Sequence, residues 1–121
     1  MDKRQKASEI FLAGVKSVKP DNLIKRYVSI SQNALLIDDL SFDLLAIKNI
    51  YIIGVGKASA VMAQTIESIL GSKITAGHII TKYDHSVPLK YIEITEAGHP
   101  VPDENGIKGT EWILSILNRV C

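Results

Sequence analysis

The stretch 50-IYIIGVGKASAVMAQTIESILG-71 decides the fold. It opens with an apolar run of the kind found in parallel strands that are buried on both faces. Two glycines and a lysine follow, at Gly54, Gly56 and Lys57. The residues after the lysine place apolar side chains on one stripe at helical spacing, and Gly71 is a typical helix stop. The stretch therefore predicts a strand, a tight glycine turn and a helix.

Strand and helix patterns keep alternating after this stretch. GHIITK and YIEIT are two further apolar runs, and the second alternates more cleanly, which places it nearer an edge of the sheet. A last helix is expected after Pro102, with Asp103 as its cap. The expected strands are residues 50–55, 77–82 and 91–95, and the expected helices are residues 58–70 and 104–120. This alternation predicts an α/β fold with a parallel sheet, in a Rossmann-like three-layer arrangement.

The residues before this core predict two helices and a small hairpin. The start of the chain carries apolar side chains at helical spacing, in a helix that is expected to stop at Pro20. Asp21 or Asn22 can cap a second short helix, DNLIKRY. VSISQNALLI is expected to form a hairpin, and SFDLLAIKN a short turn or helix. We therefore expect helices and a hairpin over residues 1–49 and a βαβ-type core over residues 50–121.

Composition places the chain among globular proteins and argues against several function classes. It has 121 residues, of which 46% are hydrophobic and 22% charged, with a formal net charge of +1. This is enough for one domain with a core, and gives no electrostatic reason to expect nucleic acid or an anionic membrane as partner. No apolar run approaches the roughly 20 residues of a membrane span. The only cysteine, Cys121, leaves no disulfide framework or thiolate cluster. A cytoplasmic enzyme fits these features.

The apolar surface exceeds what so thin a sheet can cover. The last helix carries apolar side chains at Trp112, Ile113, Leu114, Ile116 and Leu117. Three or four parallel strands cannot bury all of them. We therefore expect the chain to be the N-terminal part of a larger protein. We also expect the uncovered sheet edge and helix face to favour self-association into a homo-oligomer.

The glycine–lysine turn is the first candidate binding site. When a helix follows a strand directly, its first amides have no partners within the helix. Gly56 lacks a Cβ, so an anion can approach the backbone closely, and the helix dipole favours negative charge there. Lys57 is expected in the first helical turn, where the dipole opposes its charge unless an anion compensates it. The alternative is a tight turn with a solvated lysine.

The letters of GVGKAS exclude two familiar phosphate-binding turns. A Walker P-loop needs four residues between its glycines and then Lys-Ser/Thr, whereas one residue separates Gly54 from Gly56 and Ala58 follows the lysine. The dinucleotide fingerprint needs Gly or Ala where Ser59 stands, and its ribose-binding acid is expected earlier than Asp84. Nicotinamide binding is therefore not expected.

Two further loops are expected beside this turn. TKYDH, residues 81–85, leaves the second strand of the core, and EAGHPVPDENG, residues 96–106, joins the third strand to the last helix. Both lie at carboxyl ends of strands, where open α/β sheets bind ligands. Pro100 restrains the backbone, so His99 projects from a rigid loop as a ligand contact or as a cap on loop carbonyls. Asp103 is most simply a helix cap.

Two families carry turns of this kind. Sugar-phosphate isomerase (SIS) domains have serine directly after the basic residue, whereas the type II glycerate 2-kinases have a Gly-x-Gly-Lys-Ala-Ser turn, which GVGKAS matches. GVGKAS, TKYDH and EAGHPVPDE, in this order and spacing, resemble the N-terminal domain of the type II glycerate 2-kinases across nearly the whole chain. Asp84 departs from the glycine that the family usually has between Tyr83 and His85. The family continues into a Ser-Gly-Gly loop and a separate C-terminal domain, neither of which is in these 121 residues.

This resemblance implies an enzyme, a glycerate 2-kinase. Such an enzyme transfers the γ-phosphoryl group of ATP, with Mg²⁺, to the 2-hydroxyl of D-glycerate and forms 2-phosphoglycerate. The implied partners are small-molecule substrates, with no nucleic acid and no membrane. Some members of the family bear the name hydroxypyruvate reductase, which the missing dinucleotide fingerprint argues against. The alternative is a SIS-like domain that isomerises or senses a sugar phosphate. By the resemblance, the 121 residues alone are expected to be inactive.

The resemblance also assigns roles to individual residues. Lys57 is the expected catalytic residue, which stabilises the transferring phosphoryl group or holds the substrate carboxylate. The residues expected to shape the substrate and phosphate site are Gly54, Gly56, Ser59, His99, Pro100 and Asp103. His85 is a further candidate for ligand contact, His78 is expected to be structural, and Tyr83 and Thr81 are expected to pack the loops. No metal site is expected, because no pair of ligands has close metal-site spacing.

Overall fold

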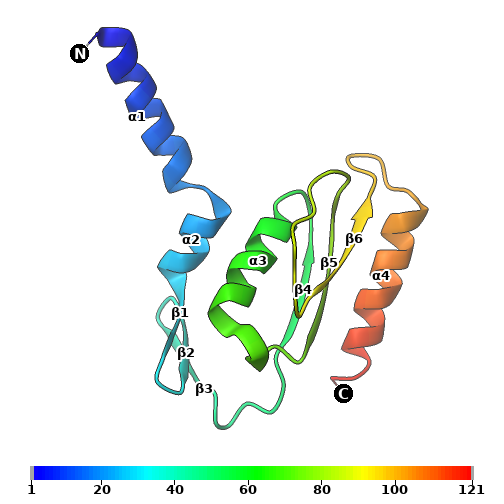
Figure 1. The fold of residues 1–121 in the computed structure, drawn as a ribbon. Coiled ribbons are helices and arrows are strands. Elements are labelled where there is room, and N and C mark those ends of the chain that lie inside the picture. Colours follow the sequence, from blue (N-terminus) through cyan, green and yellow to red (C-terminus); the bar gives the residue numbers. More distant parts are fainter. Residues whose placement is uncertain (1, 121) are drawn as a thin grey trace.

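The computed structural model describes residues 2–120, as an N-terminal part that extends away from an α/β core (Figure 1). The elements of the N-terminal part are α1 (Lys3–Ser17), α2 (Pro20–Tyr27), β1 (Val28–Ser31), β2 (Ala34–Ile37) and β3 (Leu40–Asp43). Those of the core are β4 (Tyr51–Val55), α3 (Ser59–Leu70), the 3₁₀ turn η1 (Gly71–Lys73), β5 (Ala76–Lys82), β6 (Glu93–Ala97) and α4 (Glu104–Leu117). Met1 and Cys121 lie outside the described residues. The expectation that Cys121 forms neither a disulfide nor a thiolate cluster therefore lies outside them too.

The core is a parallel sheet between two helices. β4, β5 and β6 pair in parallel in that order. Ile79 on β5 packs in the cluster that α3 covers, whereas the next residue, Ile80, packs with Ile113 of α4. Because neighbouring side chains of a strand point to opposite faces, α3 and α4 cover opposite faces of the sheet (Figure 1). The predicted α/β fold, Rossmann-like and in three layers, is confirmed.

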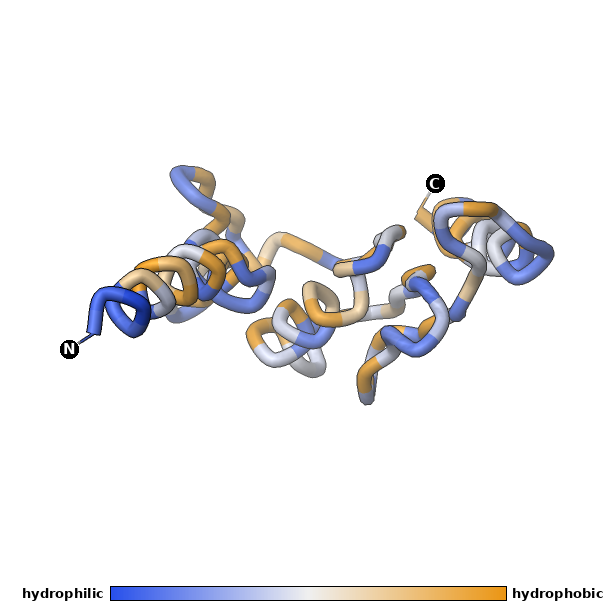
Figure 2. The backbone as a smooth tube through the Cα atoms, turned by 90° about the horizontal axis from the view of Figure 1, so that it is seen from above, coloured by the Kyte–Doolittle hydropathy of each residue, from blue (hydrophilic) through white to orange (hydrophobic). Residues whose placement is uncertain are grey.

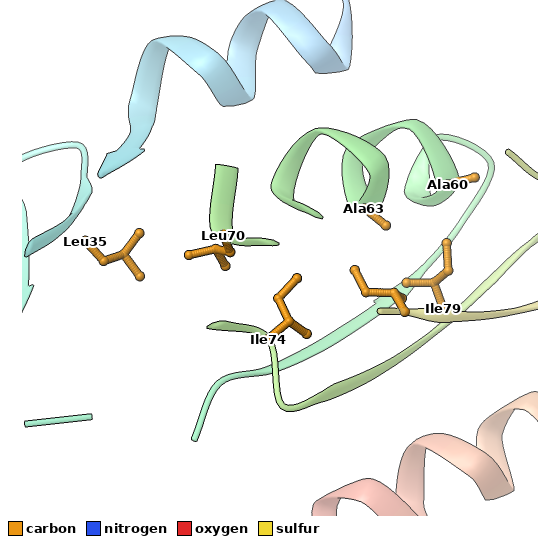
Figure 3. Packing of buried hydrophobic residues seen from close by; sticks show 7 residues of the cluster. Leu35, Ala60, Ala63, Leu70, Ile74 and Ile79 are labelled. Atoms are coloured by element: carbon orange, nitrogen blue, oxygen red, sulfur yellow. The ribbon is translucent and has the colours of Figure 1, made fainter. Parts of the chain in front are cut away.

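The main hydrophobic core lies under α3. Ala60 and Ala63 have small side chains, so α3 sits close to Ile79 in the middle of the sheet (Figure 3). Leu70 at the end of α3 meets Leu35 from β2, which joins the N-terminal part to the core (Figure 3). Each fully buried leucine or isoleucine contributes about 1.5–3 kcal/mol, so this cluster is a main source of the stability that holds the site.

The N-terminal strands form a meander of three strands. β1 pairs antiparallel with β2, and β2 with β3, which occupies residues where the sequence predicted a turn or helix. Asp38, with φ of 54°, makes the tight turn between β2 and β3. Aspartate tolerates this left-handed conformation better than most residues, which explains why the chain can turn so soon after the first hairpin.

The two N-terminal helices differ from expectation at their junction. α1 ends at Ser17, and Pro20 is the first residue of α2 rather than the stop of α1. The cap of α2 is Lys19 and neither Asp21 nor Asn22, because the fixed φ of a proline suits the first helical position. All residues of α1 are exposed, and its apolar stripe shows as orange segments near the N-terminal end in Figure 2.

No helix among residues 2–120 combines the length and the apolar character that crossing a membrane requires.

Candidate functional site

The turn between β4 and α3 depends on its two glycines. Gly56 has a φ of +124°, a conformation that side chains with a Cβ rarely adopt. A Cβ on Gly54 would lie 3.2 Å from Cγ2 of Ile79, so this glycine lets β4 lie close to β5. α3 begins at Ser59, so Lys57 lies in the turn ahead of the helix and not in its first turn, as the sequence had suggested. The lysine is exposed, just ahead of the helix start, where the Ser59 amide donates to the main-chain oxygen of Gly56 at 3.1 Å.

Ser59 holds this turn against the sheet. Its buried hydroxyl lies 2.6 Å from the main-chain oxygen of Gly56 and 3.0 Å from that of Ile80, and it donates its one proton between these acceptors. The amide of Gly56 also donates to Ile80, at 2.9 Å. Ser59 is thus engaged with backbone carbonyls, and it shapes the turn by position rather than by offering its hydroxyl to a ligand.

Lys57 and His99 line one small cavity. Its volume is about 80 Å³, and its walls come from the ends of β4, β5 and β6. The lining residues are Val55, Gly56, Lys57, Ile80, Thr81, Lys82, Ala97, Gly98 and His99. A site for a whole small-molecule ligand usually measures about 300–1,000 Å³, so this cavity suits an anionic group and not a complete nucleotide. Two lysines beside it, Lys57 and Lys82, give the cavity positive charge.

The other predicted residues lie around this cavity in two groups. Pro100 and Asp103 line an adjoining cavity of about 590 Å³, which also shares His99 and Gly98 with the small one. Gly54 and Ser59 line a separate apolar cavity of about 270 Å³ on the α3 side of the sheet. The structure thus brings Gly56, Lys57 and His99 together, places Pro100 and Asp103 next to them, and sets Gly54 and Ser59 beneath the turn.

Asp103 organises the loop that carries His99. Its carboxylate caps α4, accepting from the amide of Gly106 at 3.2 Å. A Cβ on Gly98 would come 3.1 Å from Oδ2 of Asp103 and would collide with the main-chain oxygen of Val101. Glycine at position 98 therefore lets the loop fold tightly onto the carboxylate. The peptide bond between His99 and Pro100 is cis.

Tyr83 has a polar role that the sequence analysis missed. Its hydroxyl donates to Oδ2 of Asp103 at 2.6 Å and accepts from Nδ2 of Asn105 at 2.9 Å. The hydrogen bond with Asp103 raises the pKa of Tyr83 above 10.0, and the same bond, together with one from the Gly98 amide, lowers the pKa of Asp103 below 3.8. The sequence predicted only that Tyr83 packs the loop.

Lys82 and Glu96 are two more residues that the sequence analysis did not single out. Lys82 lines the small cavity, and the argument about carboxyl ends of strands could have included it, since it ends β5. Glu96 accepts from the hydroxyl of Ser86 at 2.7 Å. That bond, followed by those from backbone amides of residues 84–86, holds the pKa of Glu96 below its ordinary 4.5. Glu96 therefore anchors the loop that follows Tyr83.

The two remaining histidines are engaged in the fold. His78 is 3% exposed, its Nε2 lies 2.7 Å from Oγ1 of Thr95, and its ring stacks on Trp112. The Nδ1 of His85 donates to the main-chain oxygen of Tyr83, 2.9 Å away, so this ring is turned back on its own loop. Among residues 2–120, no three His, Cys, Asp or Glu side chains gather closely enough to hold a metal ion.

Comparison with known proteins links this arrangement to a family of enzymes. Residues 6–121 match the profile of a family described as a domain of unknown function, DUF4147. The chain is 35% identical over 119 residues to a glycerate 2-kinase of Pyrococcus horikoshii and 36% identical over 115 residues to a D-glycerate 2-kinase of Thermotoga maritima. These matches cover 98% and 94% of the chain but 26% and 24% of the relatives. The chain thus spans about a quarter of their length.

Solved structures agree with these sequence matches. A crystal structure of a Pyrococcus horikoshii protein has a TM-score of 0.85 at 35% identity, over 98% of this chain and 26% of its own. A crystal structure of a glycerate kinase from Thermotoga maritima has a TM-score of 0.70 at 37% identity, over 91% of this chain and 23% of its own. Both likenesses therefore extend over nearly all of the present fold and a minor part of each solved chain.

Proposed function

The chain belongs to the DUF4147 family, and from this membership we propose that the full-length protein is a glycerate 2-kinase. It transfers the γ-phosphoryl group of ATP to the 2-hydroxyl of D-glycerate and forms 2-phosphoglycerate. One observation carries the proposal: Lys57 and His99, from two different strand ends, line one positively charged cavity in a chain 35% identical to a glycerate 2-kinase.

The chemistry of phosphoryl transfer suits this cavity. The transferred group spreads negative charge over its three equatorial oxygens, and catalysis depends mainly on positioning and on neutralising that charge. The exposed amine of Lys57 supplies a full positive charge, and the positive end of the α3 dipole lies behind it. We assign to Lys57 the stabilisation of the transferring phosphoryl group. His99 is the second ligand contact, because it enters the same cavity from the opposite loop.

Residues 2–120 contain no cluster of three His, Cys, Asp or Glu side chains that could serve as a dedicated magnesium site. Mg²⁺ prefers oxygen ligands, usually one or two carboxylates together with substrate phosphates. Two carboxylates of the neighbouring loops already accept hydrogen bonds. Asp103 accepts from Tyr83 and from the Gly106 amide, and Glu96 accepts from Ser86. Mg²⁺ therefore enters the proposal only as the counter-ion that ATP brings, and no residue between 2 and 120 is assigned to it.

A kinase site also needs the rest of the protein. Water competes for every charge in an open site, and closure restores positioning that is worth roughly 7–11 kcal/mol at best. Since the relatives are about four times as long as this chain, we propose that residues outside these 121 close the cleft. The 121 residues by themselves are then inactive toward glycerate, although phosphate can still bind weakly at the turn.

An ADP-release assay on the purified full-length protein tests the proposal. We expect ADP to form only when ATP, Mg²⁺ and D-glycerate are all present, and phosphorus NMR to identify 2-phosphoglycerate as the product. Thermal shift with ATP and glycerate, against a panel of sugar phosphates, distinguishes the alternative. Stabilisation by sugar phosphates alone, without glycerate-dependent ADP release, would reject the kinase and favour a SIS-like isomerase or sensor.

A further inference from the structure

The hydroxyl of Tyr83 joins two loops of the site. Tyr83 follows β5, whereas both of its hydrogen-bond partners, Asp103 and Asn105, lie where the loop after β6 enters α4. The hydroxyl uses its proton toward Asp103 at 2.6 Å and a lone pair toward Asn105 at 2.9 Å. Tyr83 as a whole is 40% exposed, so its apolar packing is only partial. The polar end of this side chain therefore makes the specific connection.

Asp103 also contacts the residue that precedes His99. The carboxylate that accepts from Tyr83 also lies against Gly98, the residue before His99. The Gly98 amide lies close to this carboxylate and adds to the lowering of the Asp103 pKa. The hydrogen bond from Tyr83 to this carboxylate is charge-assisted, and such bonds are about twice as strong as neutral ones. The position of His99 is thus tied to Tyr83 through one carboxylate.

The same loop is tied to the lysine turn on its other side. The hydroxyl of Thr81 donates to the main-chain oxygen of Lys57 at 3.3 Å, two residues before Tyr83. Hydrogen bonds thus connect the turn of Lys57, the loop of Tyr83 and the loop of His99 in series. The small cavity that Lys57 and His99 share lies along this series.

We propose that Tyr83 is a positioning residue of the site, whose hydroxyl latches the loop after β5 to the loop after β6 and holds His99 opposite Lys57. The kinetic consequence rests on the proposed kinase function, whereas the loop geometry does not. Removing the hydroxyl leaves the loop itself folded, because Glu96 still accepts from Ser86 at 2.7 Å on the other side. The hydroxyl of Tyr83 therefore sets the position of one loop against the other, and neither loop depends on it to fold.

Hydrogen exchange on the full-length protein tests the latch without any ligand. Tyr83→Phe keeps the ring and removes the hydroxyl. Tyr91→Phe is the matched control because it also removes one phenolic hydroxyl, two residues ahead of β6. We expect amide exchange at Gly98 and His99 to speed up about fivefold in Tyr83→Phe, as loss of one hydrogen bond of about 1 kcal/mol implies, and to stay unchanged in Tyr91→Phe. Unchanged exchange in both variants overturns the proposal.

A double-mutant cycle with His99→Ala separates positioning from general stability. If Tyr83 acts through His99, which contacts the ligand, Tyr83→Phe raises KM severalfold with a smaller change in kcat in the wild-type background and has almost no further effect in His99→Ala. Equal effects in both backgrounds overturn the proposal. If Tyr83→Phe does not fold, Asn105→Ala, which removes the donor to the same hydroxyl, takes its place in both experiments with a smaller expected effect. A wild type without glycerate-dependent turnover rejects the kinase function, and the exchange result then decides the latch alone.

Discussion

The hydroxyl of Thr81, on a side chain that is 2% exposed, donates to the main-chain oxygen of Lys57 at 3.3 Å. Through this bond the end of β5 supports the turn that carries the lysine. Thr81→Val keeps the shape and removes the donor, so we expect the free energy of unfolding to fall by about 1 kcal/mol. Urea unfolding measures the change. Thr110→Val, which removes an exposed hydroxyl on α4, is the control, and equal losses in the two variants would contradict a special role for Thr81.

Lys57→Ala should lower the turnover of the full-length protein by about 10²-fold or more. This is the usual effect of losing one preorganised charge that stabilises a transition state. Steady-state kinetics of ADP release measure it. Lys73→Ala, at the opposite end of the strands in η1, is the matched control and should keep wild-type turnover. Wild-type kcat and KM in Lys57→Ala would remove this lysine from the mechanism.

His99→Ala should weaken ligand binding more than it lowers stability. The ring is exposed at the cavity and contributes little to packing. Binding of ATP and glycerate by calorimetry, together with the melting temperature, separates the two effects. His85→Ala is a useful comparison, because that ring bonds to its own loop. A sharp fall in melting temperature with unchanged binding would show that His99 is a structural residue.

Two glycine-to-alanine changes should act in opposite directions. A Cβ on Gly109 of α4 would come 2.7 Å from Cγ1 of the buried Ile80. Overpacking of this kind costs about 1–3 kcal/mol, more than the gain of about 1 kcal/mol from better helix propensity. Gly109→Ala should therefore lower the free energy of unfolding. A Cβ on Gly14 of α1 would meet no atom within 4 Å. Gly14→Ala should therefore stabilise α1 through its better helix propensity, with no packing cost.

The readout for Gly14→Ala is local. Because α1 is exposed along its whole length, its extra stability should show as slower amide exchange within α1 and not as a higher global melting temperature. Circular dichroism should report a small rise in helix content. Faster exchange in α1, or a stabilised Gly109→Ala protein, would contradict the packing described for these helices.

Glu96 should make the protein sensitive to acid. Its pKa is held below 4.5 by the Ser86 hydroxyl and then by backbone amides, so the folded state binds its proton less readily than the unfolded state. The stability that ionised Glu96 contributes is fully present above pH 4.5, the pKa of an unfolded glutamate. It is lost as pH falls through the lower pKa that Glu96 has in the folded state. Glu96→Gln should therefore unfold more easily at neutral pH and lose less stability between pH 5 and 3. Parallel pH profiles for the two proteins would rule out this role. Chemical unfolding at a series of pH values gives both profiles.

The sequence predicted the core well because its signals there are local and consistent. The continuous apolar run and the helical stripe between residues 50 and 71 specify a strand and a helix whatever surrounds them. Asp103 is recognisable as a cap from its place after Pro102 and before an apolar helix. The convergence of Lys57 and His99 follows from geometry alone, because the carboxyl ends of parallel strands meet at one edge of a sheet.

Other features depend on contacts that a linear pattern does not carry. The bond from Tyr83 to Asp103 joins residues whose loops meet only after the sheet has formed. β3 was missed because its short strand is set by pairing with β2. The apolar stripe of α1 predicted an amphipathic helix correctly, but the side chain of Phe11 is 69% exposed. Periodicity indicates that a face is apolar and does not say what covers it.

The opposite placement of α3 and α4 decides how this sheet can grow. Parallel strands are joined by right-handed crossovers, so a helix on the α3 face leads the chain from β4 toward β6, and a helix on the α4 face leads it back. A strand added after α4 would therefore lie beside β4, on the edge away from β5. From β4 the chain would run to the strands on one side, and from the new strand it would run to the other side. The strand order would then reverse beside β4, which defines a topological switch point. Such points open a crevice where open α/β sheets take up nucleotides and phosphates, and the turn of Gly54, Gly56 and Lys57 stands there. The handedness of the chain is therefore an argument for the proposed site that does not depend on any side chain.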